Sequence, residues 1–349
     1  MISNKEISEQ IKGKKILVIG GTGSIGSEIV RLLLQYEPEV VRILSNDEAC
    51  LFELQQELKG NMNVRFLLGD IRDIERMKIA MENIDLVFHA AALKHVPLCE
   101  YNPMEAINTN VIGTDNVIKA AIYNKVDKCI FISTDKAVNP TSVMGATKML
   151  AERLVILANS HLSSITKFSV VRFGNVLDSR GSIIPLIRKQ IISDGRVTIT
   201  DPNMTRFIMS IPQAVNLVFK AAALSNGGEI FVFKMPAVRI MDLIEVLIEE
   251  LAPEYGIAPE SIERVFIGPR AREKIHEELM IEDEIKWMKE KKDMFIITYP
   301  IELHGIVIAG NNGMNMIAPV KGYSSESTVL LSKEEIKNLL SKEGVNHSH

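Results

Sequence analysis

The feature that most constrains the fold is a glycine-rich segment near the start of the chain. A short β-branched run at 15–20 ends at Gly20. Gly23 and Gly26 come next, and a helical pattern follows at 27–35. Glycines at this spacing let backbone N–H groups approach a pyrophosphate, and the N-terminus of the helix adds positive potential. The alternative is an ordinary tight strand-to-helix turn. We expect a dinucleotide to contact this segment at Gly20, Thr22, Gly23, Ser24, Ile25 and Gly26.

Strand and helix patterns alternate through the rest of the first half. Strands are expected at 40–45, 64–68, 85–89, 128–133 and 167–173, and helices between them include 48–58, 103–123 and 145–158. Continuous apolar strands separated by helices indicate a parallel sheet covered on both faces. We therefore expect an α/β fold, a Rossmann-type doubly wound parallel sheet with a smaller α/β substrate-binding lobe.

The pattern becomes less regular after residue 176. Helices are expected at 182–192, 212–224, 240–251 and 272–280, and strands at 197–200 and 229–234. We expect residues 1–176 to form the dinucleotide-binding domain, with 212–240 returning to it. Residues 177–349 should form mainly the substrate-binding lobe.

Composition narrows the class of protein. A net charge of −4 over 349 residues argues against a nucleic-acid partner, which would require a basic stripe. Cys50, Cys99 and Cys129 are odd in number and widely spaced, which favours a reducing cytoplasm over a disulfide framework. The N-terminus carries no apolar signal core, and no apolar run approaches the ~18 residues of a membrane span. We expect a cytoplasmic protein without a transmembrane segment or a metal site.

Further cofactor contacts are expected where the next strands end. Ser45, Asn46 and Asp47 follow the second strand, where a carboxylate holds a ribose diol or an arginine holds a 2′-phosphate. Asp47 fits the first role and equally fits the N-cap of the following helix. Because neither 46 nor 47 is basic, NAD and NADP both remain open. Asp70 and Ile71 suit the adenine edge, and Ala90, Ala91 and Ala92 provide small side chains beside the cofactor.

The candidate catalytic residues lie after the fifth strand. Short-chain dehydrogenases/reductases use Tyr-x-x-x-Lys, but Met144 occupies the tyrosine position here while Lys148 is present. Methionine has no exchangeable proton, so either the protein is catalytically silent or Asp135 and Lys136 carry the proton chemistry. The alternative for that couple is a solvated ion pair. We expect Lys148 to hold the nicotinamide ribose and Lys94, after the fourth strand, to lie beside the cofactor mouth.

These segments together resemble the nucleotide-sugar 4,6-dehydratase family of extended short-chain dehydrogenases/reductases, which acts on UDP-N-acetylglucosamine. The resemblance covers nearly the whole chain. It rests on GGTGSIG (20–26), AALKHVP (91–97), NVIGT (110–114), STDKAVNP (133–140), MGATK (144–148), RFGNV (172–176), TRF (205–207) and EKIHEE (273–278). The ending YSS (323–325) before LSKEEI (331–336) resembles members that invert carbon 5.

The resemblance implies a reaction and its residues. A sugar 4-hydroxyl is oxidised, water leaves from carbon 6, and the hydride returns there through bound NAD(P). Asp135 would be the acid, Lys136 the base, and Thr134 a partner of the 4-hydroxyl. The other implied contacts are Asn110 to cofactor, and Lys94, Met144, Asn175, Arg206, Arg270 and Glu273 to substrate.

Two departures and two alternatives accompany this expectation. The family often has arginine where Asn46 stands, and Arg-Pro-Gly-Glu-Lys where this chain reads RAREK at 270–274. A UDP-N-acetylglucosamine 4-epimerase on the same scaffold would need no base at carbon 5. A catalytically silent NAD(P)-binding module is the alternative from another class. We expect a homo-oligomer that takes part in bacterial surface polysaccharide synthesis.

Overall fold

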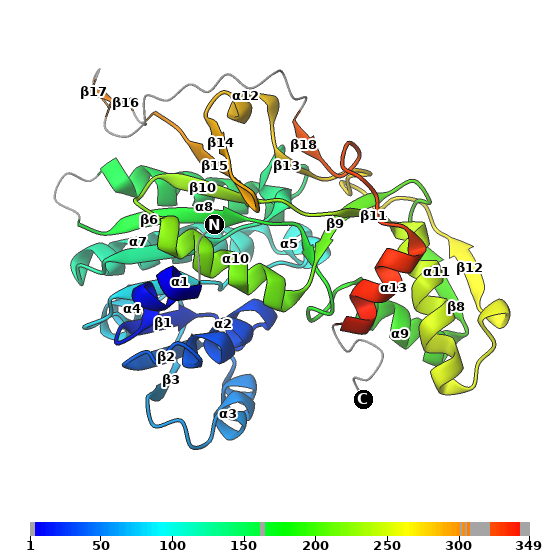
Figure 1. Ribbon diagram of the computed structural model, residues 1–349, viewed down its shortest axis with the longest axis horizontal. Helices are drawn as coiled ribbons and strands as arrows, with labels where there is room; N and C mark the ends of the chain where they lie inside the picture. The colour runs from blue at the N-terminus through cyan, green and yellow to red at the C-terminus, as the bar shows by residue number, and fades with distance from the viewer. Residues whose placement is uncertain (1–3, 161–164, 301, 304–305, 308–321, 343–349) are drawn as a thin grey trace.

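The computed structural model describes residues 4–160, 165–300, 302–303, 306–307 and 322–342, and these form two lobes (Figure 1). Within the described residues, the larger lobe is built on a nine-stranded sheet in the order β14-β15-β10-β6-β5-β4-β1-β2-β3. Its strands are β1 (Lys15–Ile19), β2 (Val40–Ser45), β3 (Val64–Leu68), β4 (Leu86–His89), β5 (Lys128–Ile132), β6 (Lys167–Arg172), β10 (Glu229–Phe233), β14 (Met288–Glu290) and β15 (Met294–Thr298).

The strands from β10 to β3 all run parallel, and β15 and β14 add an antiparallel edge. β1 pairs with β2 on one side and β4 on the other, so the strand order reverses between β1 and β4. Ligands of open parallel sheets bind beyond the carboxyl ends of the strands at such a reversal. The prediction of a Rossmann-type doubly wound sheet is confirmed.

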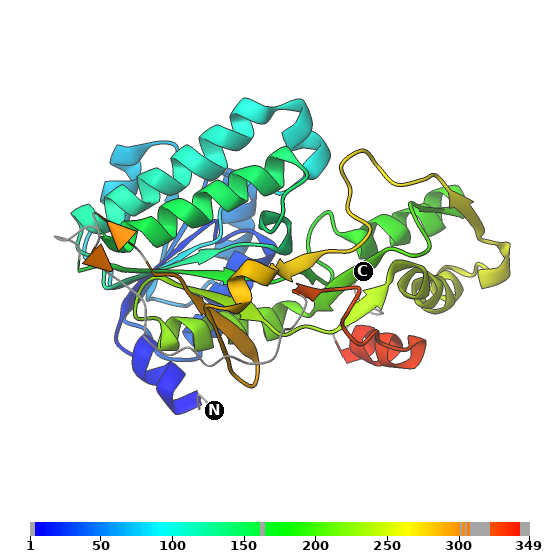
Figure 2. The same cartoon turned by 90° about the horizontal axis from the view of Figure 1, so that it is seen from above.

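Helices cover both faces of this sheet (Figure 2). One face carries α1 (Asn4–Ile11), α2 (Ser24–Leu34) and α10 (Ile211–Leu224), which contact one another. The other face carries α4 (Ile74–Ala80), α7 (Gly113–Tyr123) and α8 (Val143–Leu157). The shorter helices of this lobe are α3 (Glu48–Glu57), α5 (Val96–Tyr101), α6 (Pro103–Ala106), the 3-10 turns η2 (Asp135–Ala137) and η3 (Ala158–Ser160), and α12 (Glu282–Ile285).

The smaller lobe has an apolar core of its own. β7 (Asn175–Val176), β9 (Thr205–Met209) and β11 (Ala237–Arg239) form a sheet, and β8 (Arg196–Ile199) pairs with β12 (Glu263–Phe266). Helices α9 (Ile183–Asp194), α11 (Ile240–Leu251) and α13 (Lys333–Lys342) bury Ile187, Leu247 and Ile336 together. The remaining elements are η4 (Ala252–Tyr255), η5 (Pro259–Ser261), β13 (Glu278–Met280) paired with β18 (Tyr323–Ser324), and β16 (Glu302–Leu303) paired with β17 (Ile306–Val307).

Two expected elements differ in the structure. The helix expected at 103–123 is divided into α6, a π-helical turn η1 (Ile107–Ile112) and α7. The helix expected at 272–280 is wrong, because that segment is extended and ends in β13. The domain division at residue 176 stays a prediction, and the chain beyond it contributes β10, β14 and β15 to the large sheet.

Candidate active site

The glycine-rich turn leaves room for a diphosphate beside its backbone. Gly20 has a φ of +75°, and a Cβ there would lie 2.7 Å from the backbone nitrogen of Ala91. A Cβ on Gly26 would lie 2.2 Å from the Gly20 carbonyl oxygen, so that contact between helix and strand also requires glycine. Gly23 caps α2 without a side-chain hydrogen bond to its first turn. These residues fit the pyrophosphate of a dinucleotide.

The end of β2 is organised by its own side chains. The hydroxyls of Thr22 and Ser45 lie 2.7 Å apart, and the Ser45 hydroxyl accepts a hydrogen bond of 3.1 Å from the Asp47 N–H. Asp47 is the N-cap of α3 and accepts from the Cys50 N–H at 3.0 Å, a backbone hydrogen bond that lowers the pKa of Asp47. Asp47 was expected either to hold a ribose diol or to cap the following helix. The structure shows the cap, and the ribose contact stays a prediction. The Asn46 amide donates to Asp70 at 3.3 Å.

Arg180 approaches the same position from a distant part of the chain. It follows β7, and its backbone N–H donates to the Ser24 hydroxyl at 3.0 Å. Its guanidinium donates to the Cys50 sulfur at 3.0 Å, beside the N-terminus of α3. Sequence reasoning missed this residue because no local motif places the loop after β7 over the end of β2.

One expected cofactor residue, Asn110, has a structural role in the loop after β4. The buried Asn110 amide bonds the backbone of Leu93 at 2.8 and 3.0 Å and the Thr147 hydroxyl at 3.0 Å. It thereby holds the loop after β4 against α8. Ala90, Ala91 and Ala92 are half-buried in that loop, Lys94 is exposed, Ile71 is buried, and Asp70 pairs with Arg72 at 2.8 Å.

Lys148 is buried beside the ends of the central strands. Its ammonium donates to the Ile132 carbonyl at 2.7 Å and lies 3.9 Å from the centre of the Phe131 ring. Burial lowers the pKa of Lys148 to about 7, although Glu152 opposes the shift. Met144, one helical turn earlier, is buried in a small apolar cluster with Cys99 and Ala106.

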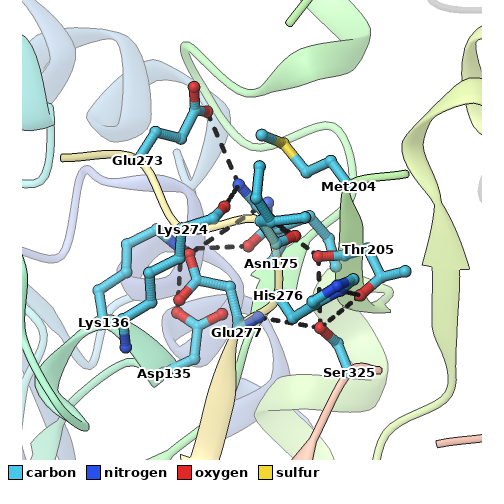
Figure 3. A network of polar contacts seen from close by, with 12 residues as sticks. Asp135, Lys136, Asn175, Met204, Thr205, Glu273, Lys274, His276, Glu277 and Ser325 are labelled. Atoms are coloured by element: carbon cyan, nitrogen blue, oxygen red, sulfur yellow. Dashed lines mark hydrogen bonds and ion pairs between the residues drawn. The ribbon is translucent and has the colours of Figure 1, made fainter. Parts of the chain in front are cut away.

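The acid–base couple converges because β5 ends before it. β5 stops at Ile132, and Asp135 and Lys136 lie in the 3-10 turn η2. Adjacent residues of a strand point to opposite faces, whereas this turn brings both side chains together. The Asp135 Oδ1 accepts from the Thr134 hydroxyl at 2.8 Å. It also accepts from the Lys136 ammonium at 3.0 Å (Figure 3). Asp135 is 0% exposed, so the couple is not a solvated ion pair.

Asp135 keeps one carboxylate oxygen uncommitted. Its Oδ2 is buried and has no hydrogen-bond partner among the described residues. A buried carboxylate oxygen without a partner is costly, so it is a candidate to receive a proton or a ligand hydroxyl.

Lys136 contacts two further groups, one of which the sequence reasoning missed. Its ammonium lies 3.3 Å from the Asn175 Oδ1 and 3.5 Å from the Glu277 Oε1 (Figure 3). Burial by itself would lower the pKa of Lys136, but the charge of Asp135 and then that of Glu277 outweigh it and raise the pKa. Glu277 belongs to the EKIHEE segment, and its burial against Lys136 depends on the extended form of a segment that we had expected to be helical.

A cavity of about 660 Å³ opens beside this cluster between the two lobes. Arg206 lines it, but its guanidinium already donates to the carbonyls of Thr205, Lys274 and Ile275 at 2.8–3.0 Å. The wall also includes Lys136, Asn175, Arg270, Glu273 and Glu277. The cavity therefore brings Lys136 together with four of the expected substrate residues, while Asp135, Lys94 and Met144 are not among the residues that form its wall.

Comparisons with known proteins show the family to which the chain belongs. The family described as "Polysaccharide biosynthesis protein" matches residues 16–299. The chain is 42% identical, over 83% of its length and 84% of the relative, to the UDP-N-acetylglucosamine 4,6-dehydratase (inverting) of Campylobacter jejuni subsp. jejuni serotype O:23/36. It is 57% identical, over 96% and 98%, to a Methanocaldococcus jannaschii protein called "Uncharacterized membrane protein MJ1061". Among the residues described here, no helix is long and apolar enough to cross a membrane.

A solved structure and a relative with a different name are also similar to this chain. The X-ray structure of Pen from Bacillus thuringiensis superposes with a TM-score of 0.88 at 46% identity, covering 95% of this chain and 98% of that one. A Rickettsia rickettsii relative that is 41% identical, over 94% of this chain and 95% of its own length, is named UDP-glucose 4-epimerase. The chain therefore belongs to the polysaccharide biosynthesis family of extended short-chain dehydrogenases/reductases that contains the nucleotide-sugar 4,6-dehydratases.

Proposed function

We propose that this protein converts UDP-N-acetylglucosamine to a UDP-4-keto-6-deoxy-N-acetylhexosamine, with inversion at carbon 5, for surface polysaccharide synthesis. One observation carries the proposal: Lys136 lines the cavity and pairs with the buried Asp135 at 3.0 Å, while Met144 is buried in place of the usual tyrosine. Named relatives support the substrate class.

The residues divide the proton chemistry between them. A bound NAD(P) would accept hydride from carbon 4 and return it to carbon 6. The uncommitted Oδ2 of Asp135 takes the proton of the 4-hydroxyl, because Met144 has none to exchange. Lys136 then removes the carbon-5 proton, and Asp135 donates its new proton to the carbon-6 hydroxyl, which leaves as water. For inversion, carbon 5 takes its new proton from water on the opposite face of the ring, and Lys136 releases its own proton to solvent.

Other side chains orient the reactants. Thr134 holds Asp135 through Oδ1, so Oδ2 is the oxygen that would contact the sugar. Lys148 would hold the ribose of the cofactor. Asn175 and Arg270 line the cavity and would contact the substrate beyond the hexose, where arginine suits diphosphate oxygens.

Isotope tracing tests the proposal. The protein is incubated with UDP-N-acetylglucosamine that carries deuterium at carbon 4, without added reductant. We expect a product lighter by one water, with the deuterium at carbon 6 and inverted carbon 5 by NMR. Loss of the label to solvent, or no turnover while cofactor stays bound, would contradict the proposal.

A 4-epimerase is the second candidate, because Rickettsia relatives over 94% of the chain carry that name. Epimerisation leaves the product mass unchanged. It also gives Lys136 no carbon-5 proton to remove, so exchange of deuterium from heavy water into carbon 5 separates the two reactions.

A further inference from the structure

We propose that Glu277 is a positioning residue that takes a proton from Lys136, so that Lys136 enters the reaction as a neutral amine. The inference rests on the proposed function and deepens it. Glu277 lies outside the STDK motif that supplies Asp135 and Lys136, on the extended segment between β12 and β13.

The starting state of Lys136 creates the need for such a group. A lysine ammonium has three donors. Three acceptors surround it, Asp135 Oδ1 at 3.0 Å, Asn175 Oδ1 at 3.3 Å and Glu277 Oε1 at 3.5 Å. The two carboxylates stabilise the charged form, which has no lone pair with which to remove a proton from carbon. One proton must therefore leave Lys136 before the elimination.

Glu277 is the neighbour best able to receive that proton. It is 3% exposed, and its Oε2 has no hydrogen-bond partner among the described residues. Burial raises the pKa of Glu277, and the charge of Asp135 raises it further, while Lys136, Arg206 and Lys274 act in the opposite direction. Asp135 is less suited, because its Oδ1 already accepts two hydrogen bonds and its Oδ2 is needed for the 4-hydroxyl proton.

The fold holds Glu277 in this place. Its backbone N–H donates to the Ser325 hydroxyl at 2.9 Å, and its carbonyl accepts from the Ser325 N–H at 2.8 Å (Figure 3). Arg206 of β9 faces the same carboxylate at 3.9 Å. The charged groups around Glu277 are thus Asp135 and Lys136 on η2, Arg206 on β9, and Lys274 on its own segment.

The proton transfer is balanced. An N–H bond of Lys136 breaks and an O–H bond forms on Glu277, so the charged pair becomes a neutral pair with the same number of protons. The amount of neutral Lys136 is then set within the pair and does not depend on pH. Without the carboxylate, neutral Lys136 must form by loss of a proton to water, and its amount rises tenfold per pH unit.

The test measures kcat/KM of Glu277→Gln across pH. Each value is divided by the wild-type value at the same pH, which cancels the titration of other groups. We expect activity to fall about a hundredfold near pH 7, the usual value of a positioned acid or base, and the ratio to recover about tenfold per pH unit toward pH 9. Glu277→Asp keeps a carboxylate, so its ratio should stay flat. A ratio for Glu277→Gln that is constant with pH would assign Glu277 a structural role and overturn the inference.

Glu278→Gln is the matched control. Its carboxylate lies one residue along and bonds the Asn139 amide at 2.9 Å instead of Lys136, so its ratio should stay near one at every pH. A readout that needs no turnover accompanies it: competitive acetylation of Lys136, followed by mass spectrometry across pH. Acetylation of wild-type Lys136 should change little with pH near neutrality, whereas in Glu277→Gln it should be slower near pH 7 and rise about tenfold per pH unit. Identical profiles would contradict the coupling even if the dehydratase reaction itself is absent.

Discussion

In the proposed reaction, Asp135 is the acid and Lys136 the base, and substitution of each tests its role. Asp135→Asn keeps the shape of the buried side chain but removes the proton acceptor, and Lys136→Ala removes the base. Each should slow turnover of UDP-N-acetylglucosamine by about a hundredfold or more. Product formation is followed by mass spectrometry, with Lys189→Ala, an exposed lysine of α9, as control. Near-normal rates in both variants would exclude them from the reaction.

The buried Lys148 side chain makes the stability of the folded protein depend on pH. The pKa of Lys148 is about 7 in the folded protein, whereas the ordinary lysine value of 10.5 applies to the unfolded chain. Between these values the unfolded chain binds a proton that the folded chain lacks, so the free energy of unfolding rises with pH and the cost of burial is complete below about pH 7. Lys148→Met should flatten this rise by up to about 1.4 kcal/mol per pH unit between pH 7.5 and 9.5. Urea denaturation measures it, and exposed Lys59→Met should leave the slope unchanged.

At the scale of elements, a buried ion triad joins β6, α8 and α12. Arg172 bonds Glu152 at 2.7 Å and Glu284 at 2.9 Å, and all three side chains are buried. Arg172→Met should destabilise the protein by about 3–5 kcal/mol, because two buried carboxylates lose their partner. Denaturation midpoints measure the loss. Adding Glu152→Gln and Glu284→Gln should recover part of it, and no recovery would mean that packing, not charge, is responsible.

Helices and strands could be predicted from the sequence where the local residue pattern matches the position that the element takes in the fold. β2 and β3 begin and end where the mostly apolar runs indicated, although β3 lies at the edge of the sheet and leaves Arg65 and Leu68 exposed. The segment 272–280 has helix-forming residues, yet three of its side chains reach the connection between β5 and α8. Lys274 bonds the Val138 carbonyl at 2.7 Å, Glu277 pairs with Lys136, and Glu278 bonds Asn139. These tertiary contacts outweigh the helix propensity of the segment, and no residue pattern within the segment predicts them.

At the scale of the whole molecule, the site is assembled from segments far apart in sequence. The STDK motif and the glycine turn were recognisable because each carries its chemistry within a few residues. Glu277 and Arg180 were not, because each acts through a position more than a hundred residues away, on the other lobe. Arg206 was expected to contact the substrate, but two of the three carbonyls that its guanidinium bonds belong to the 272–280 segment, which was expected to be helical.

We predict that Arg180 makes the choice between NAD and NADP depend on both lobes. The end of β2 offers Asn46 and a capping Asp47 but no cation, whereas Arg180 brings its guanidinium to Cys50 at the start of α3. A guanidinium there can pair with a 2′-phosphate, and a charged hydrogen bond contributes about 1.5–3 kcal/mol. Arg180→Ala should therefore weaken NADP binding about tenfold or more and NAD binding far less, as measured by calorimetric titration of cofactor-free protein. Exposed Arg196→Ala controls for net charge, and equal weakening of both cofactors would place Arg180 on the shared diphosphate instead.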